Sequence, residues 1–238
     1  MDNIHFVAGK SLAIVALFLV SCQLTNMKTY KVNKTATPIE ITGEGTDQAW
    51  EQAQILTDFT YPWREETAPQ TTFRSLWDDT YFYFLYRAED PDIVTKKRGL
   101  GERDAVDSDR VEIFFKSDDN MDPYYALEMD ALGRVLDTQG RYHRNIDYNW
   151  NWPEGHFVLK ASIDSEGYWV EGSITWESLR QLGMYKDDHM LKAGLYRGEY
   201  ANLEDGAIDI KWISWVMPDS PTPDFHIPSS FGVLELVE

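Results

Sequence analysis

Two glutamates on neighbouring predicted strands are the first candidates for chemistry. Glu112 and Glu128 each alternate with apolar residues, so both are expected to project from the outer face of one sheet. Carboxylates there could accept hydrogen bonds from ligand hydroxyls, and a catalytic pair would need one raised pKa and carboxyls about 5 to 9.5 Å apart. Solvated surface glutamates are the simplest interpretation, ligand binding is the second, and catalysis is the third.

Large aromatic side chains gather in long segments without strand periodicity. They are Tyr142, Tyr148, Trp150 and Trp152 in segment 138–155, Phe225 in segment 216–231, where His226 follows it, and Trp63 in a third loop. Flat aromatic faces can cover the apolar surface of a ring-shaped ligand, and long loops of this composition are typical of functional sites. We predict ligand contacts for Trp150, Trp152, Phe225 and His226, with Trp150 and Phe225 as the main stacking pair.

Acidic turns in the chain could bind a hard cation. Asp104, Asp107 and Asp109 lie in one such turn and segment 118–122 forms another, although neither has EF-hand spacing. Structural Ca²⁺ at the three aspartates is a hypothesis, and hydrated surface turns are the alternative. The histidines show no HExxH pairing and the one cysteine lies near the N-terminus, so a zinc site is not expected.

Composition favours a binding protein over an enzyme or a nucleic-acid partner. The chain has 22 Lys and Arg against 40 Asp and Glu, a net charge of −18, which repels nucleic-acid backbones. Neutral glycans and cations remain compatible partners. The sequence contains no GxSxG, P-loop or GxGxxG motif, and we assign no catalytic residue.

The N-terminus has the pattern of an exported lipoprotein. An apolar run over residues 12–20 follows Lys10 and ends at Ser21 and Cys22, which predicts a signal peptide at 1–21 and lipidation of Cys22. A membrane span is the alternative, but the run is shorter than the roughly 20 residues that a bilayer core requires. Polar residues 22–38 predict a tether. We therefore expect a cell-envelope protein that is lipid-anchored, at the outer membrane or facing the periplasm, and that meets the membrane only through its lipid.

Residues 39–238 predict one all-β domain, a two-sheet antiparallel β-sandwich with one or two short helices. Short alternating or β-branched segments recur between Gly, Pro, Asp and Asn clusters. The clearest are 71–77, 81–88, 110–116, 124–129, 157–163, 168–174, 191–200, 209–214 and 233–237. Segments 47–54 and 175–182 predict the helices, with Thr175 as an N-cap.

The order of landmarks along this domain resembles the family 9 carbohydrate-binding modules. The matching segments are 39–43 with Asp47 and Trp50, then 74–78, 81–83, 90–91, 109–115, 167–179 with Trp176, and 226–234 after Trp215. The resemblance implies a jelly-roll-like sandwich that often carries structural calcium. In xylanase-linked members of the family, the domain holds the reducing end of a glycan between two tryptophans.

The residues of that sugar grip are only partly present in this chain. The resemblance aligns the two clamp tryptophans with Val106 and Phe225, and it aligns an arginine that holds sugar hydroxyls with Glu128. Among the polar contacts that can be placed, only Glu112 is kept. The resemblance therefore implies the fold more strongly than it implies the reducing-end clamp.

Non-catalytic carbohydrate binding by a membrane-anchored lipoprotein is the function that these observations favour. The expected ligand is a neutral glycan, with glycan-degrading enzymes or transporters as neighbours. One alternative is an interaction scaffold without a sugar site, which Val106 and Glu128 would favour. The others are a xylanase-like protein associated with glycoside hydrolysis, and a haem binder of the related sandwich group.

Overall fold

The computed structural model describes residues 27–203 and 207–238, which form twelve strands and very little helix. The strands are β1 (Thr29–Lys34), β2 (Thr71–Trp77), β3 (Tyr81–Glu89), β4 (Arg110–Lys116), β5 (Tyr124–Asp130), β6 (Val135–Arg141), β7 (Asn145–Asp147), β8 (Phe157–Ile163), β9 (Gly167–Thr175), β10 (Met190–Asn202), β11 (Ile208–Ser214) and β12 (Gly232–Val237). The helical segments are η1 (Gln48–Gln52), η2 (Gly101–Asp107), α1 (Trp176–Gln181) and η3 (Pro228–Ser230). Within these described ranges, no helix has the length and hydropathy to cross a bilayer.

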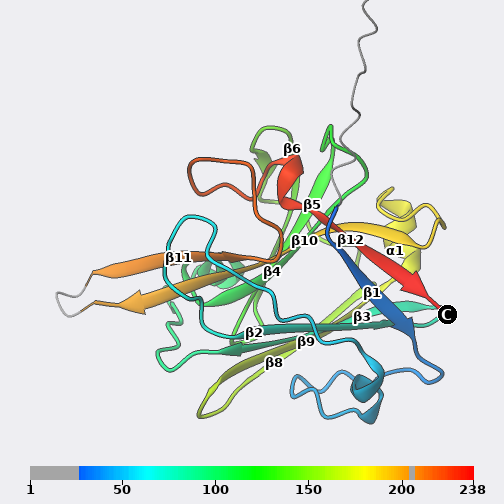
Figure 1. Cartoon of the computed structure of the whole chain (residues 1–238), viewed down its shortest axis with the longest axis horizontal. Helices are drawn as coiled ribbons and strands as arrows, with labels where there is room; N and C mark the ends of the chain where they lie inside the picture. Colours follow the sequence, from blue (N-terminus) through cyan, green and yellow to red (C-terminus); the bar gives the residue numbers. More distant parts are fainter. Residues whose placement is uncertain (1–26, 204–206) are drawn as a thin grey trace, which may run out of the picture.

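The strands belong to one sheet that curls over on itself (Figure 1). Its order is β7-β6-β5-β4-β10-β12-β1-β2-β3-β9-β8, with β11 beside β10. β1 runs parallel to both β12 and β2, so it joins the two layers of the sandwich through main-chain hydrogen bonds. The all-β sandwich is confirmed, and the two parallel ladders correct the expectation of purely antiparallel pairing.

The main core lies between the two layers. Val111, Ile113 and Phe115 point into it from β4, and Phe82 from β3 meets Phe115 with ring centroids 6.3 Å apart. Because successive side chains of a strand alternate between its two faces, the even-numbered residues of β4 lie on the outer face. The predicted outward direction of Glu112 is therefore confirmed.

The folded domain begins earlier than the sequence indicates. β1 lies inside segment 22–38, where a tether is expected, yet Tyr30 and Val32 are buried in the core and the strand pairs with β12. The predicted boundary at residue 39 is thus wrong. Two alternating apolar residues among Thr, Lys and Asn are too short a periodic signal to indicate a strand. Cys22 and the predicted signal peptide at 1–21 lie outside the described residues.

Most of the local structure follows the sequence pattern. Each strand expected from the sequence forms within two residues of its predicted bounds. The Thr175 hydroxyl accepts the Ser178 N–H at the start of α1, as predicted, whereas Asp47 caps a 3-10 turn rather than an α-helix. Segment 138–155 is only partly a loop, because it includes the end of β6 and all of β7.

The outer face of β4, β5 and β10 carries a second, smaller apolar cluster. The segment between β11 and β12 returns over this face and places Phe225 on Tyr196, with ring centroids 4.1 Å apart and planes 9° apart. Phe114 and Phe231 complete the contact. This cover stops short of Arg110 and leaves a cleft between the returning segment and the β6–β7 hairpin.

Candidate functional site

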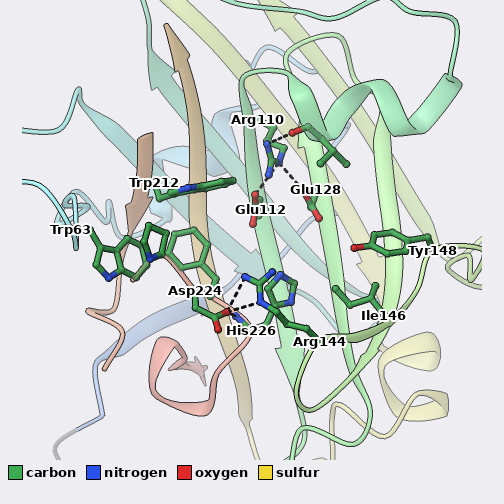
Figure 2. A pocket seen from close by; sticks show the side chains of 13 residues that line it. Trp63, Arg110, Glu112, Glu128, Arg144, Ile146, Tyr148, Trp212, Asp224 and His226 are labelled. Carbon is green, nitrogen blue, oxygen red and sulfur yellow. Dashed lines mark hydrogen bonds and ion pairs between the residues drawn. The ribbon is translucent and has the colours of Figure 1, made fainter. Parts of the chain in front are cut away.

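A cleft of about 210 Å³ opens on the outer face of β4, β5 and β10 (Figure 2). Its lining comes from six parts of the chain: Trp63, Val106, Arg110, Glu112, Glu128, Arg144, Ile146, Tyr148, Trp212, Pro223, Asp224, Phe225 and His226. The floor is made by strand residues, and the walls are made by loops together with Trp212 of β11 and Ile146 of β7. Such a site can combine a rigid charged base with adaptable sides.

Arg110, Glu112 and Glu128 form the floor of the cleft. Glu112 and Glu128 are opposite each other in the β4–β5 ladder, so their side chains rise side by side. Arg110 Nε lies 2.9 Å from Glu112 Oε1 and 2.8 Å from Glu128 Oε2. The simplest interpretation of the sequence, two solvated surface glutamates, is wrong, because Glu112 is only 2% exposed and Glu128 only 9%.

Gly198 makes room for the guanidinium of Arg110. It pairs with Arg110 on β4 and with Trp212 on β11, so it lies between the two side chains. A Cβ at this position would approach Arg110 Nη1 to 3.0 Å and the Trp212 ring to 3.2 Å. The guanidinium packs against the Trp212 ring, 5.2 Å from its centroid.

The carboxylates of Glu112 and Glu128 have too few hydrogen-bond donors around them. Nε of Arg110 carries one hydrogen for two carboxylate oxygens, and Nη1 donates instead to the Val106 carbonyl and the Tyr200 hydroxyl. Among the described residues, Glu112 Oε1 accepts no well-aligned hydrogen bond. Burial is the main reason that the pKa of Glu112 rises to about 8; Arg110 opposes this rise and Glu128 adds to it.

Glu112→Gln should make stability less dependent on pH. The carboxyl has an ordinary pKa of 4.5 and a folded pKa of about 8, so between these values the folded state holds a proton that the unfolded state releases. Folding stability therefore falls as pH rises through this window. We expect the variant to melt about 3 to 6 °C above the wild type at pH 8.5, with the difference vanishing near pH 4.5, in melting curves recorded across this range. Glu177→Gln, an exposed change on α1, is the control; equal effects of both substitutions would contradict the assignment.

Aromatic rings form two opposite walls of the cleft. Trp212 and Trp63 stand on one side, each in contact with Phe225, at centroid distances of 5.8 and 5.5 Å. Tyr148 stands on the other side, across the carboxylates, and is 47% exposed (Figure 2). Phe225 itself is only 6% exposed, so its neighbours cover most of its surface.

Polar residues form the side of the cleft that is lower in Figure 2. Asp224 accepts hydrogen bonds from Arg144 Nη2 at 3.1 Å and from the backbone N–H of His226. His226 Nδ1 lies 2.7 Å from the Tyr124 hydroxyl. Burial, followed by the nearby Arg144, lowers the pKa of His226 to about 4, so the imidazole is neutral near pH 7.

The predicted site residues divide into two groups. Glu112, Glu128, Phe225 and His226 all line the cleft, although Phe225 is only 6% exposed. Trp150 and Trp152 do not.

Trp152 is a core residue, and Trp150 packs against the core. Trp152 is 6% exposed and packs against Phe115, and Trp150 lies over Tyr125 with ring centroids 4.7 Å apart. The hypothesis of Trp150 and Phe225 as a stacking pair is not supported by this geometry. The backbone N–H of Trp152 donates a hydrogen bond to the Asp137 carboxylate on β6, which holds this loop against the sheet.

The three aspartates proposed for calcium do not assemble a metal site. Asp104 accepts hydrogen bonds from Arg98 and two backbone N–H groups, and Asp107 pairs with Arg98. Asp109 is buried and accepts the N–H groups of Val94 and Tyr200. No group of three or more His, Cys, Asp or Glu in the described ranges could hold a metal ion. Each of the three carboxylates is instead bound by arginine or backbone N–H groups of the protein. Calcium binding therefore stays a prediction, without these three aspartates as its ligands.

Several residues of the cleft had only weak signals in the sequence. Trp63 and Tyr148 belong to aromatic loops but lie far apart along the chain. Trp212 follows a strand pattern in which Ile213 is the buried neighbour, so its parity indicates an outward direction. Arg110 shares the parity of Glu112, and Arg144 carried no signal beyond its position beside aromatic residues.

Comparison with known proteins assigns the domain. Residues 41–238 match the family described as carbohydrate family 9 binding domain-like. The chain belongs to this family. Family 9 domains are non-catalytic carbohydrate-binding modules, in agreement with the expectation of a binder. One relative is the exoglucanase XynX of Acetivibrio thermocellus, 25% identical over 136 residues, which are 57% of this chain and 11% of that enzyme. The chain therefore matches only about a tenth of that relative's length.

Solved structures share the fold. A Bacteroides uniformis protein has a TM-score of 0.67 and 18% identity, covering 89% of this chain and 100% of that one. A family 9 module from Caldicellulosiruptor kristjanssonii in complex with cellotriose has a TM-score of 0.58 and 19% identity, with 88% and 93% of the two chains covered. A structure with glucose from the same organism has a TM-score of 0.52 and 20% identity, with 88% and 96% covered.

The positions aligned with the sugar grip converge in this family 9 domain. Val106, Glu112, Glu128 and Phe225, which are scattered over about half of the chain, all line the one cleft. Three of the four differ from the residue that the resemblance places there, and of these three only Phe225 is still aromatic. The aromatic surface is present, but Trp212, Trp63 and Tyr148 provide it.

Proposed function

We propose that the cleft binds a glycan, with Trp212 and Tyr148 as the facing rings over the floor of Glu112 and Glu128. The observation that carries the proposal is the convergence of the aligned grip positions on a cleft with aromatic walls and a carboxylate floor. Complexes of the Caldicellulosiruptor modules with cellotriose and glucose support a sugar as the ligand class.

The chemistry of the cleft suits a sugar ring. Indole and phenol faces can cover the C–H surfaces of the ring, while carboxylate oxygens accept hydrogen bonds from its hydroxyls. The volume of about 210 Å³ is below the roughly 300–1,000 Å³ of most small-molecule pockets. A short segment or one end of a glycan chain is therefore the expected ligand.

Calorimetric titration with glucose, cellotriose and xylotriose tests this function. We expect saturable binding of one ligand per protein with Kd between about 10 µM and 1 mM, equivalent to about 4 to 7 kcal/mol. The absence of binding across a broad glycan panel would contradict the proposal and favour the scaffold alternative.

We also propose that the domain is held at the cell envelope by a lipid on Cys22, beside enzymes that degrade glycans. Residues 19–22 support the anchor, and the partial match to an exoglucanase supports the setting. Cys22→Ala should move the protein from the detergent phase to the aqueous phase of a detergent partition, because the acyl chains would be missing. Cys22→Ser is a second variant with the same expected result. If wild type and both variants partition alike, the anchor is absent.

A further inference from the structure

The charges lining the cleft do not balance. Three carboxylates, Glu112, Glu128 and Asp224, face two guanidiniums, Arg110 and Arg144. Arg144 is bound to Asp224, and Arg110 is shared between the two glutamates. When both glutamates are ionised, one negative charge on the floor therefore has no cation of its own in the lining.

The uncompensated charge belongs to the Glu112–Glu128 pair. Glu112 is 2% exposed, lies in the cleft lining and has an oxygen without an aligned donor. Both carboxylates are directed into the cleft beside Arg110 (Figure 2). Burial raises the pKa of Glu112 to about 8, so near pH 7 this carboxyl holds a proton in place of the missing counter-charge, and a bound cation would displace that proton. His226 does not provide one, because its own pKa is lowered to about 4.

The missing cation matches a charged group on the ligand. An ammonium has three N–H donors and no acceptor, so it can serve both carboxylates at once. It would lie between Trp212 and Tyr148, where aromatic rings attract a cation; Arg110 and Arg103 already pack against these rings, 5.2 and 5.4 Å from their centroids. A carboxylate on the sugar would instead meet the like charge of Glu128 and could not replace the proton of Glu112.

We propose that the cleft of this domain is selective for amino sugars with a free ammonium group, such as glucosamine units, over neutral and acidic sugars. This inference rests on the proposed glycan-binding function. The ammonium takes the place of the proton on Glu112 and so supplies the counter-charge of the glutamate pair, while the sugar ring takes the same aromatic walls as a neutral ligand. Glucosamine-containing oligosaccharides bind most tightly, their N-acetylated forms and cello-oligosaccharides bind less tightly, and uronic acid oligosaccharides bind least.

Titration of one protein with four matched trisaccharides tests the selectivity. The ligands are glucosamine trimer, N-acetylglucosamine trimer, cellotriose and galacturonic acid trimer, at pH 6.5 and low ionic strength. We expect glucosamine trimer to bind one ligand per protein with at least tenfold higher affinity than cellotriose, and added salt should reduce this ratio. An affinity for cellotriose equal to or higher than that for glucosamine trimer would overturn the selectivity and leave glycan binding intact. Binding of none of the four would overturn both.

Two variants distinguish the effect of the charge in the cleft from the effect of the net charge of −18 on the whole chain. Glu128→Gln keeps the shape of the floor and removes one charge, so the ratio of the two affinities should fall to about one. Glu177→Gln removes an equal charge on α1, outside the cleft, and should leave the ratio unchanged. Equal ratios in both variants, or binding of several glucosamine trimers per protein, would mean surface attraction only and overturn the proposal.

Discussion

Trp212→Ala is expected to weaken sugar binding at least tenfold, a loss of about 1.4 kcal/mol or more. The ring forms one aromatic wall of the cleft and covers the guanidinium of Arg110. Its removal takes away a stacking surface and exposes the charged floor to water. Calorimetric titration with the best ligand of the panel measures the loss.

Trp169→Ala provides a matched control for this experiment. Trp169 is also a half-buried strand tryptophan packed on an arginine, with Arg87 4.9 Å from its ring centroid, but it lies outside the cleft. The two variants should lose similar stability, and only Trp212→Ala should lose affinity. Unchanged affinity in Trp212→Ala, or equal losses in the two variants, would move the binding surface elsewhere.

Trp152→Ala is expected to destabilise the domain by about 3 to 5 kcal/mol. The ring is 6% exposed, packs against Phe115, Tyr125 and Phe157, and donates to the Ser178 hydroxyl. Its loss leaves a cavity that the surrounding strands cannot fill. The melting temperature should fall by about 6 to 20 °C, which calorimetry or circular dichroism would record.

Trp152→Phe tests whether packing is the cause. Phenylalanine keeps an aromatic ring in the core and loses mainly the hydrogen bond to Ser178, so the loss should be clearly smaller than in the alanine variant. Native-like stability of Trp152→Ala together with lost sugar affinity would instead restore this residue to the binding site.

Trp152 and Trp212 show why aromatic residues in a loop do not by themselves identify the residues of a binding site. Both are tryptophans near polar residues, and segment 138–155, which contains Trp152, is rich in aromatic residues. A loop has no periodicity, so the direction of its side chains depends on partners that are distant in sequence, here Tyr125 for Trp150 and Ser178 for Trp152. Trp212 lies on a strand, where parity relative to Ile213 determines that it points outward.

Local patterns in the sequence determined the strands, the cap at Thr175 and the shared outer face of Glu112 and Glu128, because alternation follows from strand geometry alone. The order of motifs along the chain was also enough to indicate the family. The tertiary structure decided which residues meet in the cleft and what their charge state is. Arg110, which the two glutamates share, is covered by Trp212 and bound by Tyr200, and the place of β1 depends on its pairing with β12. These are long-range contacts, and a short sequence window contains no physical signal of them.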